Sequence, residues 1–366
     1  MASRPATSVQ PASARSASAL AAPGNFSIMA HSPTPFNVRS GYPAARPVTW
    51  RAHRLRRYRA SRHLTTGRIM PPPTSLADLG LPLAGPWPAN ALARVEAGAR
   101  RQTTPTPHGD MVWRVWGAAG PPLVMLHGGY GSWGHWIRNA LPLSRHFTVY
   151  TPDTPGLGDS PAPPKPHTAE AIAAVLAPAI ACILPEGARF DLVGFSFGAV
   201  VGGPTAALLG ERVRSFTLVG AGGMGLPRAL SPPLEKFRHD MTPENLATLA
   251  RRNLEVLMLA DPGKVDPLAI HMQTVNTLGA RVKSRFISRS EALKAALPRI
   301  KAPLKGIWGS RDSTAAPYLD RREAMLRTVD PGVDFRVIQG AGHWVAYEAA
   351  EHFNATLIDM LRPMAR

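Results

Sequence analysis

The pentapeptide Gly194-Phe195-Ser196-Phe197-Gly198 is the part of the 366-residue chain whose residue types and spacing most clearly suggest chemistry. It lies between the apolar run Phe190–Val193 and a stretch of small residues, so it predicts a strand, a sharp turn and a helix. In such a turn the serine hydroxyl projects above the sheet. Side chains two residues before and after it would collide, so both positions need glycine. We therefore interpret Ser196 as a nucleophile that attacks a carbonyl group.

A serine nucleophile needs a base to accept its proton and a third group to orient that base. Asp312 lies in the turn that follows the predicted strand Leu304–Trp308, and His343 lies in a glycine-rich loop further along the chain. The order serine, aspartate, histidine is the one found where the nucleophile sits between a strand and a helix. We predict a catalytic triad with Ser196 as nucleophile, His343 as base and Asp312 as supporting acid.

Other residues of suitable chemistry are interpreted as structural. His352, in the last helical stretch, is expected to be exposed, and residues 217–234, another place for the acid, contain no Asp or Glu. His127 is expected to brace its loop through hydrogen bonds, and Asp153 and Asp159 are expected to act as turn or capping carboxylates. No cluster of His, Asp and Glu has the spacing of metal ligands, so no metal site is predicted.

The negative charge that develops on a substrate oxygen requires two backbone N–H donors. Phe197, the residue after the nucleophile, is expected to supply one of them. The other is expected from the turn His127-Gly-Gly-Tyr-Gly131, at Gly129, with Tyr130 as the neighbouring alternative. Glycines in this turn would let the backbone approach the substrate closely.

From about residue 108, short β-rich runs alternate with longer helical stretches, which is typical of a doubly wound, mostly parallel α/β sheet. Together with the serine turn, this pattern predicts the α/β-hydrolase fold. The predicted strands are Met111–Trp116, Pro122–Leu126, Phe147–Tyr150, Phe190–Val193, Ser215–Val219, Leu304–Trp308 and Arg336–Ile338. Helices are predicted over roughly 168–184 and from His343 to about Leu361.

More than 80 residues separate the predicted strands at 215–219 and 304–308, far more than a bare crossover needs. We predict that residues 226–297 form a helical cap over the serine, and that residues 71–225 and 298–366 form the core. Apolar cap residues could line a substrate pocket or pack into the core of the cap itself. These residues are Phe237, Met241, Leu257, Met258, Met272 and Phe286.

The net charge of +18 is concentrated at the N-terminus. Residues 1–77 contain 11 Arg, no Lys and no acidic residue, while the remaining 31 basic and 24 acidic residues give a net charge of +7. The basic run 51–63 could bind nucleic acid, or the segment could be a transit peptide. We favour a disordered basic extension over residues 1–70, with Met70 as an alternative start, and expect no nucleic-acid partner.

The composition of the chain indicates which cellular compartments are compatible with it. The single cysteine, Cys182, excludes an internal disulfide and fits a reducing compartment. No run of about 18 apolar residues suggests a membrane span, and the N-terminus is a poor match to a secretory signal. We expect a cytoplasmic protein that acts on a small molecule, away from membranes, unless the N-terminal segment directs import into an organelle. A homo-oligomer is compatible with the sequence.

Three further segments resemble the meta-cleavage product hydrolases, namely Leu218–Leu226, Gly342–Glu348 and Glu351–Asn354. The resemblance extends in order and general spacing over about residues 108–364. It implies an α/β-hydrolase that splits a carbon–carbon bond in vinylogous 1,5-diketones from the degradation of aromatic rings. It also implies an enzyme without a cofactor.

The chain departs from the pattern of that family at two positions. Phe195 stands before the nucleophile, where the family tends to have Asn. The cap arginine that would contact a substrate carboxylate falls near His271, although Arg281 and Arg285 lie close enough to serve. Tyr130, Phe195 and Trp344 are further candidate substrate contacts. A neutral ester or another diketone therefore fits the sequence as well as a carboxylate-bearing dienone does.

The predicted function is hydrolysis of a small acyl substrate, either a carboxylic ester or the carbon–carbon bond of a dienone or diketone. Haloalkane dehalogenases and epoxide hydrolases place aspartate at the nucleophile position, so Ser196 argues against both. A cofactor-free perhydrolase or haloperoxidase shares the same triad and remains an alternative. A ligand receptor that retains the triad without turnover is the non-enzymatic alternative.

Overall fold

The computed structural model describes residues 76–82, 85–229 and 232–362, all of which belong to one compact unit, Arg68–Arg366. The predicted basic extension, residues 1–70, lies outside the described residues and stays a prediction. Among the described residues, no helix is long and apolar enough to cross a membrane.

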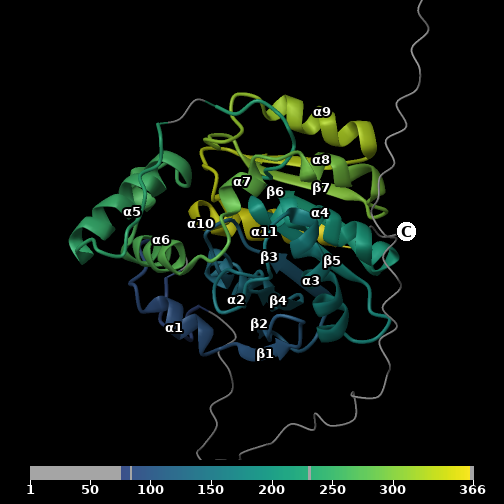
Figure 1. The fold of residues 1–366 in the computed structure, drawn as a ribbon, viewed down its shortest axis with the longest axis horizontal. Coiled ribbons are helices and arrows are strands. Elements are labelled where there is room, and N and C mark those ends of the chain that lie inside the picture. Colours follow the sequence, from purple (N-terminus) through teal and green to yellow (C-terminus); the bar gives the residue numbers. More distant parts are fainter. Residues whose placement is uncertain (1–75, 83–84, 230–231, 363–366) are drawn as a thin grey trace, which may run out of the picture. The chain divides into compact units, whose positions relative to one another are not determined.

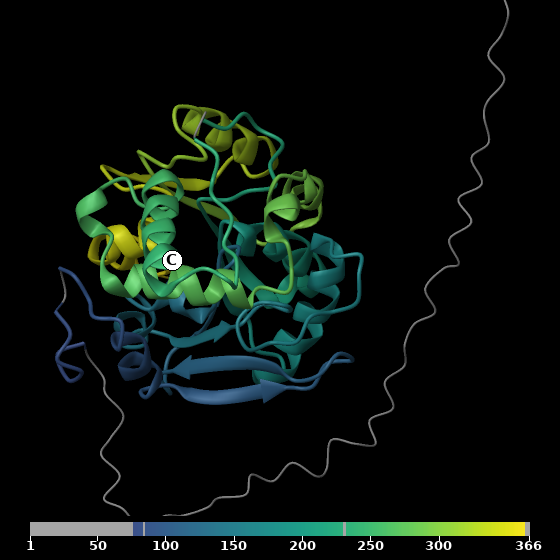
Figure 2. The same cartoon turned by 60° about the vertical axis from the view of Figure 1, so that its left-hand side comes forward.

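Eight strands form one sheet in the order β1-β2-β4-β3-β5-β6-β7-β8. β1 and β2 are antiparallel to their neighbours and lie at one edge (blue in Figure 2), whereas the strands from β4 to β8 pair in parallel. All seven predicted strands are present, and β1 was not predicted. The strands are β1 Arg100–Thr104, β2 Met111–Trp116, β3 Pro122–Leu126, β4 Thr148–Pro152, β5 Phe190–Phe195, β6 Val213–Val219, β7 Leu304–Gly309 and β8 Asp334–Ile338.

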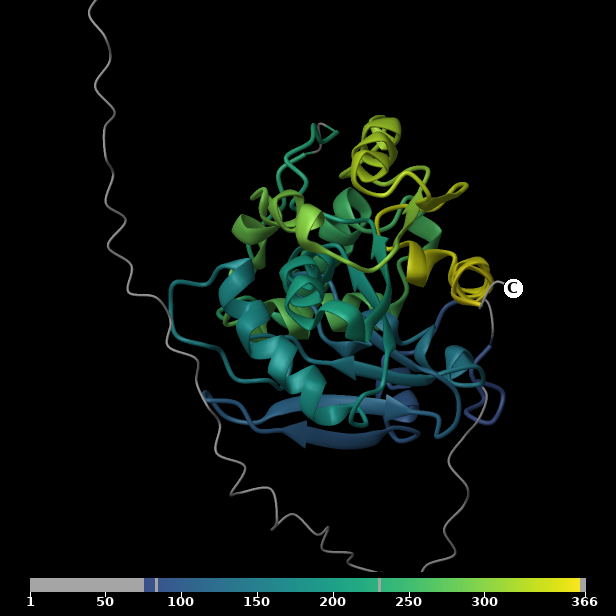
Figure 3. The same ribbon diagram turned by 90° about the vertical axis from the view of Figure 1, so that its right-hand side faces the viewer.

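Helices cover both faces of the sheet, which confirms the doubly wound α/β architecture (Figures 1 and 3). Within β3, Leu123 and Met125 join one apolar cluster and Val124 and Leu126 join the other, because successive side chains of a strand point to opposite faces. The core helices are α1 Ala91–Glu96, α2 Ala140–Leu143, α3 Ala169–Ile183, α4 Phe197–Leu209, α9 Leu319–Val329, α10 Val345–Glu348 and α11 Ala350–Leu361. α2 and α11 contribute to the first cluster, and α3 and α4 to the second.

The last helical stretch differs from the prediction of one helix that begins at His343. The short helix α10 ends at Glu348, and α11 begins at Ala350. Ala349 between them has φ −125° and ψ 48°, which is outside the helical region and interrupts the hydrogen-bond ladder. His343 itself precedes α10 and lies in a loop.

The insertion between β6 and β7 carries four described α-helices: α5 Pro243–Leu257, α6 Pro267–Gly279, α7 Ser284–Ser288 and α8 Ala292–Ala296. Local signals explain the two long ones. Thr242 and Asp266 cap the N-termini of α5 and α6 by accepting backbone hydrogen bonds, and proline follows each cap. Of the apolar residues expected to line a pocket or pack in the cap, Met258 and Met272 are buried, but Phe286 is 73% exposed and does neither.

A buried arginine joins three parts of the core. The Arg114 guanidinium on β2 pairs with Asp153 at 2.7 Å, with Asp159 at 2.6 Å and with Glu96 at 2.6 Å. The side chains of Arg114 and Asp153 are 6% and 1% exposed. Burial acts to lower the pKa of Arg114, but the three carboxylates outweigh it and raise that pKa. Asp153 also accepts the N–H groups of Trp133 and Asp159, so its turn role is confirmed and a buried ion pair is added.

We expect Arg114→Met to lower the free energy of unfolding by about 3–5 kcal/mol, because it leaves the Asp153 carboxylate buried without its cation. Arg336→Met is the matched control, since Arg336 also pairs with two carboxylates but is 37% exposed, where the loss should be about 1 kcal/mol or less. Urea unfolding monitored by circular dichroism measures both. Equal losses in the two variants would contradict the role assigned to Arg114.

Candidate active site

Ser196 occupies a strained turn between β5 and α4. Its φ is +50°, a conformation that only glycine adopts readily, and its N–H donates to Val219 O at 2.8 Å. A Cβ at Gly194 would lie 2.6 Å from Ala199 Cα, and one at Gly198 would lie 2.3 Å from Leu126 O. The predicted strand, turn and helix are therefore present, and both glycines are required by contact with backbone atoms.

The structure brings the three residues of the predicted triad into one chain of hydrogen bonds. His343 Nε2 lies 3.0 Å from Ser196 Oγ, and His343 Nδ1 lies 2.9 Å and 3.0 Å from the two Asp312 oxygens. Asp312 is fully buried and His343 is 3% exposed. Because a carboxylate only accepts hydrogen bonds, Nδ1 must carry the proton, which leaves Nε2 free to accept the proton of the serine.

The environment of Asp312 favours its charged form. Burial acts to raise the pKa of this carboxyl, but the charge of His343 and hydrogen bonds from His343 and Thr314 outweigh it and lower the pKa. Thr314 contributes both its N–H and its hydroxyl to Asp312 Oδ1, at 2.7 and 2.8 Å. Sequence reasoning missed Thr314, although its position two residues after an aspartate in a turn is typical of this kind of contact.

Near the serine, the backbone N–H groups of Phe197 and Gly129 have no acceptor among the described residues. A Cβ at Gly129 would lie 3.4 Å from Phe197 Cβ, so the two residues are in close proximity. The amide of Tyr130, by contrast, donates to Ser284 Oγ at 3.2 Å. The geometry therefore favours Gly129 over Tyr130 as the second N–H donor.

Ser284 brings the cap into contact with this loop. It is the first residue of α7, is 1% exposed, and accepts the N–H of Tyr130, whose φ of +47° is strained. Its Oγ would lie only 2.5 Å from a Cβ at Gly129. The cap thus fixes the backbone that carries one of the free amides, a contact between residues 154 positions apart that no local pattern could indicate.

Two buried histidines stabilise the same loop. His127 Nδ1 is 2.8 Å from Gly128 O, and its Nε2 accepts the N–H of Thr154 at 2.9 Å, which confirms the predicted bracing role. His135 was missed by sequence reasoning. Its Nδ1 accepts the N–H of Gly128 at 3.1 Å. Burial lowers the pKa of both histidines, that of His135 strongly, so both are neutral near pH 7.

The two aromatic residues predicted to contact substrate lie in the core. Phe195 is fully buried and its ring centroid is 5.1 Å from that of His343, so it packs beside the base. Trp344 is 2% exposed, donates to His135 O at 2.9 Å and stacks on Tyr347. Both side chains are placed to support His343 and His135 rather than to face an open cavity.

The three basic residues predicted near a substrate carboxylate are dispersed. Arg281 donates to Gly158 O at 2.8 Å and to Ser160 O at 2.6 Å, so its guanidinium braces a loop of the core. His271 lines a groove between α5 and α6. Arg285 lies on α7 and has no side-chain hydrogen bond or ion pair in the part of the chain that the structure describes. The structure shows none of them in contact with Ser196.

The groups assembled around Ser196 are of the kinds that acyl transfer needs. Across residues 76–82, 85–229 and 232–362, no group of three or more His, Cys, Asp or Glu is arranged to hold a metal ion. The described residues offer instead a hydroxyl, a base, a carboxylate and two free amides, which are the components of acyl transfer.

Comparison with known proteins places these features in a family. A sequence model of the alpha/beta hydrolase family matches residues 123–355. A 2-hydroxy-6-oxononadienedioate/2-hydroxy-6-oxononatrienedioate hydrolase of Paraburkholderia phymatum is 30% identical over 67% of this chain and 88% of its own length. The protein of the same name from Burkholderia vietnamiensis is 29% identical over the same shares. Among solved structures, the carboxylesterase CesB of Bacillus subtilis shares the fold, with a TM-score of 0.58, 19% identity, and coverage of 72% of this chain and 91% of its own.

We expect His135→Ala to slow covalent labelling of Ser196 by a fluorophosphonate about tenfold or more. The change leaves the Gly128 N–H without its acceptor in a buried position and loosens the loop beside Gly129. The rate is measured as a gel-based time course. His146→Ala, at an exposed histidine, is the control and should label at the wild-type rate. Equal rates in the two variants would rule out a positioning role for His135.

We expect Ser284→Ala to slow the same labelling reaction several-fold, because the Tyr130 N–H loses its acceptor and the free amide of Gly129 is less well held. The melting temperature of this variant should change little, since one hydrogen bond contributes about 1 kcal/mol. Ser144→Ala removes a hydroxyl that bonds only to Leu141 O and serves as the control. An unchanged labelling rate for Ser284→Ala would show that the cap contact does not support the site.

Proposed function

The chain belongs to the alpha/beta hydrolase family, and on that basis we propose that it is a serine hydrolase that cleaves a small acyl substrate through Ser196, His343 and Asp312. The observation that carries the proposal is the continuous hydrogen-bond chain from Ser196 Oγ through the His343 ring to the buried Asp312 carboxylate. The strained backbone at Ser196 supports it, because such strain concentrates at functional residues.

The mechanism follows from the geometry. Ser196 Oγ attacks the substrate carbonyl carbon while His343 Nε2 takes its proton, and Asp312 stabilises the imidazolium that forms. The amides of Phe197 and Gly129 donate to the developing oxyanion. The tetrahedral intermediate collapses to an acyl-enzyme as His343 returns the proton to the leaving group. A water molecule, deprotonated by His343, then releases the acid and restores the serine.

Two kinds of leaving group fit this sequence of steps. An ester releases an alcohol oxygen, which His343 protonates directly. A vinylogous 1,5-diketone releases an enolate carbon, so the dienol must first be converted to its keto form to make that carbon a leaving group. His343 is the base placed to assist this proton transfer. We favour the carbon–carbon substrate because the relatives at 29% and 30% identity are named for dienedioate hydrolysis.

The expected outcome for Ser196→Ala is loss of hydrolysis by about 10⁴-fold or more, since attack and proton transfer both depend on the hydroxyl. The chain and the variant are assayed with short p-nitrophenyl esters and with a yellow meta-cleavage dienone. Ser144→Ala is the control and retains activity. Decay of the dienone colour by the wild type alone assigns carbon–carbon hydrolysis, and ester cleavage alone assigns a carboxylesterase.

A further outcome distinguishes an enzyme from a receptor on the same fold. If a fluorophosphonate labels Ser196 but neither substrate class is turned over, the nucleophile is activated and the acyl group tested is wrong. If Ser196 resists labelling in the folded protein, the hydrogen-bond chain does not activate it and the proposed function is overturned. Circular dichroism confirms folding in either case.

A further inference from the structure

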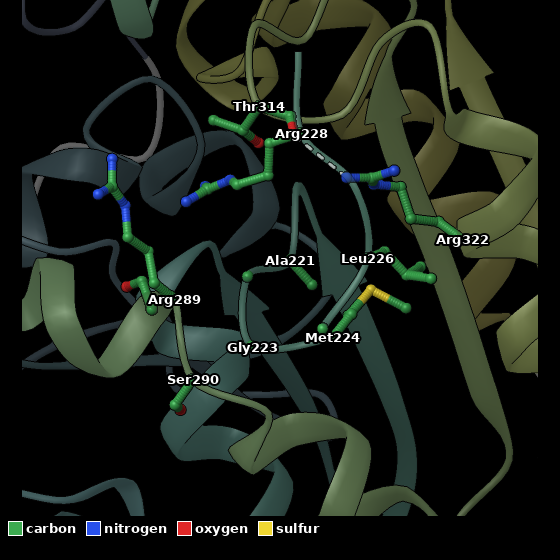
Figure 4. A pocket seen from close by; sticks show the side chains of 12 residues that line it. Ala221, Gly223, Met224, Leu226, Arg228, Arg289, Ser290, Thr314 and Arg322 are labelled. Atoms are coloured by element: carbon green, nitrogen blue, oxygen red, sulfur yellow. Dashed lines mark hydrogen bonds between the residues drawn. The ribbon is translucent and has the colours of Figure 1, made fainter. Parts of the chain in front are cut away.

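A small cavity lies beside the site, on the side of β6 and β7 (Figure 4). It has a volume of about 60 Å³, which is room for a few water molecules or one small polyatomic anion. The glycine-rich segment 221–226 after β6 forms one wall, and Ser288–Ser290 of the cap forms another. Thr314, which binds Asp312, and Arg322 complete the lining.

Three arginines from separate parts of the chain line this cavity: Arg228 from the segment after β6, Arg289 from the cap, and Arg322 from α9 (Figure 4). Arg322 is 4% exposed and donates to three backbone carbonyls, those of Tyr318, Pro227 and Thr314. Arg228 and Arg289 are exposed, and among the described residues neither guanidinium forms a hydrogen bond or an ion pair.

Some, but not all, of the arginines in the described part of the chain pair with a carboxylate. Nine other arginines there each pair with at least one Asp or Glu: Arg101, Arg114, Arg138, Arg214, Arg238, Arg251, Arg252, Arg327 and Arg336. Two carboxylates near the cavity, Asp312 and Glu291, are already engaged. Asp312 binds His343 and Thr314, and Glu291 pairs with Lys294.

The guanidinium groups at the cavity repel one another. Although part of Arg228 is exposed, partial desolvation of its guanidinium lowers its pKa, the charge of Arg289 lowers the pKa further, and the charge of Asp312 acts in the opposite direction. Gathering guanidinium groups in this way costs free energy that a bound anion would offset, because a planar fork of N–H donors binds a carboxylate or phosphate with two parallel hydrogen bonds.

We propose that the cavity lined by Arg228, Arg289 and Arg322 binds a small oxyanion, of the carboxylate or phosphate class. The anion is either the terminal carboxylate of the acyl substrate or a free anion, and in the first case the inference rests on the proposed hydrolase function. The cavity adjoins the triad, as binding of the substrate's terminal carboxylate requires. Ala221, which lines it, follows Gly220, where a Cβ would lie 3.2 Å from both Asp312 Oδ2 and His343 Nδ1.

The test compares the wild type with Arg228→Gln/Arg289→Gln and with Arg299→Gln, a control at an exposed arginine just after the cap that has no side-chain partner in the described residues. Matched substrates differ in one charge: p-nitrophenyl hexanoate against the p-nitrophenyl half-ester of adipic acid, and the octanoate against the half-ester of suberic acid. In parallel, the melting temperature is measured with added sodium phosphate against sodium chloride at equal ionic strength.

If the anion belongs to the substrate, the double variant raises KM for the half-esters about tenfold or more, while kcat and both parameters for the neutral esters stay near wild type. If the anion is free, phosphate raises the melting temperature of the wild type and of Arg299→Gln but not of the double variant. In that case KM for the half-esters is the same in the double variant as in the wild type. Either result supports the site and assigns its source.

The proposal is overturned if the double variant matches the wild type in both its half-ester KM and its response to phosphate. Arg289→Glu provides a second variant, because a carboxylate at this position should repel the anion and weaken binding further than Gln does. If the wild type hydrolyses none of these esters, that result counts against the proposed function but not against the anion site. The phosphate response does not depend on turnover and would still decide whether the anion site exists.

Discussion

The close approach of α4 to the ends of β3 and β5 is the constraint on which the rest of the site depends. A side chain at Gly198 would meet the carbonyl oxygen of Leu126, so the helix can begin at this distance from the sheet only because that position is glycine. At the same turn Ser196 has a φ of +50°, and the N–H of Phe197, at the start of α4, has no acceptor among the described residues. The proposed nucleophile and one proposed oxyanion donor thus depend on the same packing contact.

Buried charges hold the loops that surround this contact. Glu348 accepts the N–H of Gly342, next to His343, and the N–H groups of Ala260 and Asp261 in the cap. Arg114 and Asp153 perform the same task at the other end of the site, where Asp153 accepts the N–H of Trp133. Each carboxylate is 8% exposed or less, so its hydrogen bonds are costly to break and the loops have one preferred arrangement.

The features that could be predicted from the sequence are those encoded over short distances or by chain order. The spacing of the glycines around Ser196 indicates a turn that has no room for larger side chains. Apolar runs along the chain identify seven of the eight strands. Asp312 and His343 follow from their places after two successive strands. Arg114 could not be matched with Asp153, 39 positions away, because nothing in either segment specifies the partner. The roles of His135 and Arg281 depend in the same way on contacts that exist only after folding.

The insertion between β6 and β7 also contacts the loop that carries Gly129. Its segment from Arg281 to Ser284 is fixed to the core twice, through the Arg281 guanidinium on the carbonyls of Gly158 and Ser160 and through the Ser284 hydroxyl on the amide of Tyr130. A movement of this segment would change the position of Gly129, and with it the stabilisation of the oxyanion. Because Ser288 and Arg289 continue the same segment into the arginine-lined cavity, an anion bound there would bear on the alignment of the oxyanion donors as well as on affinity.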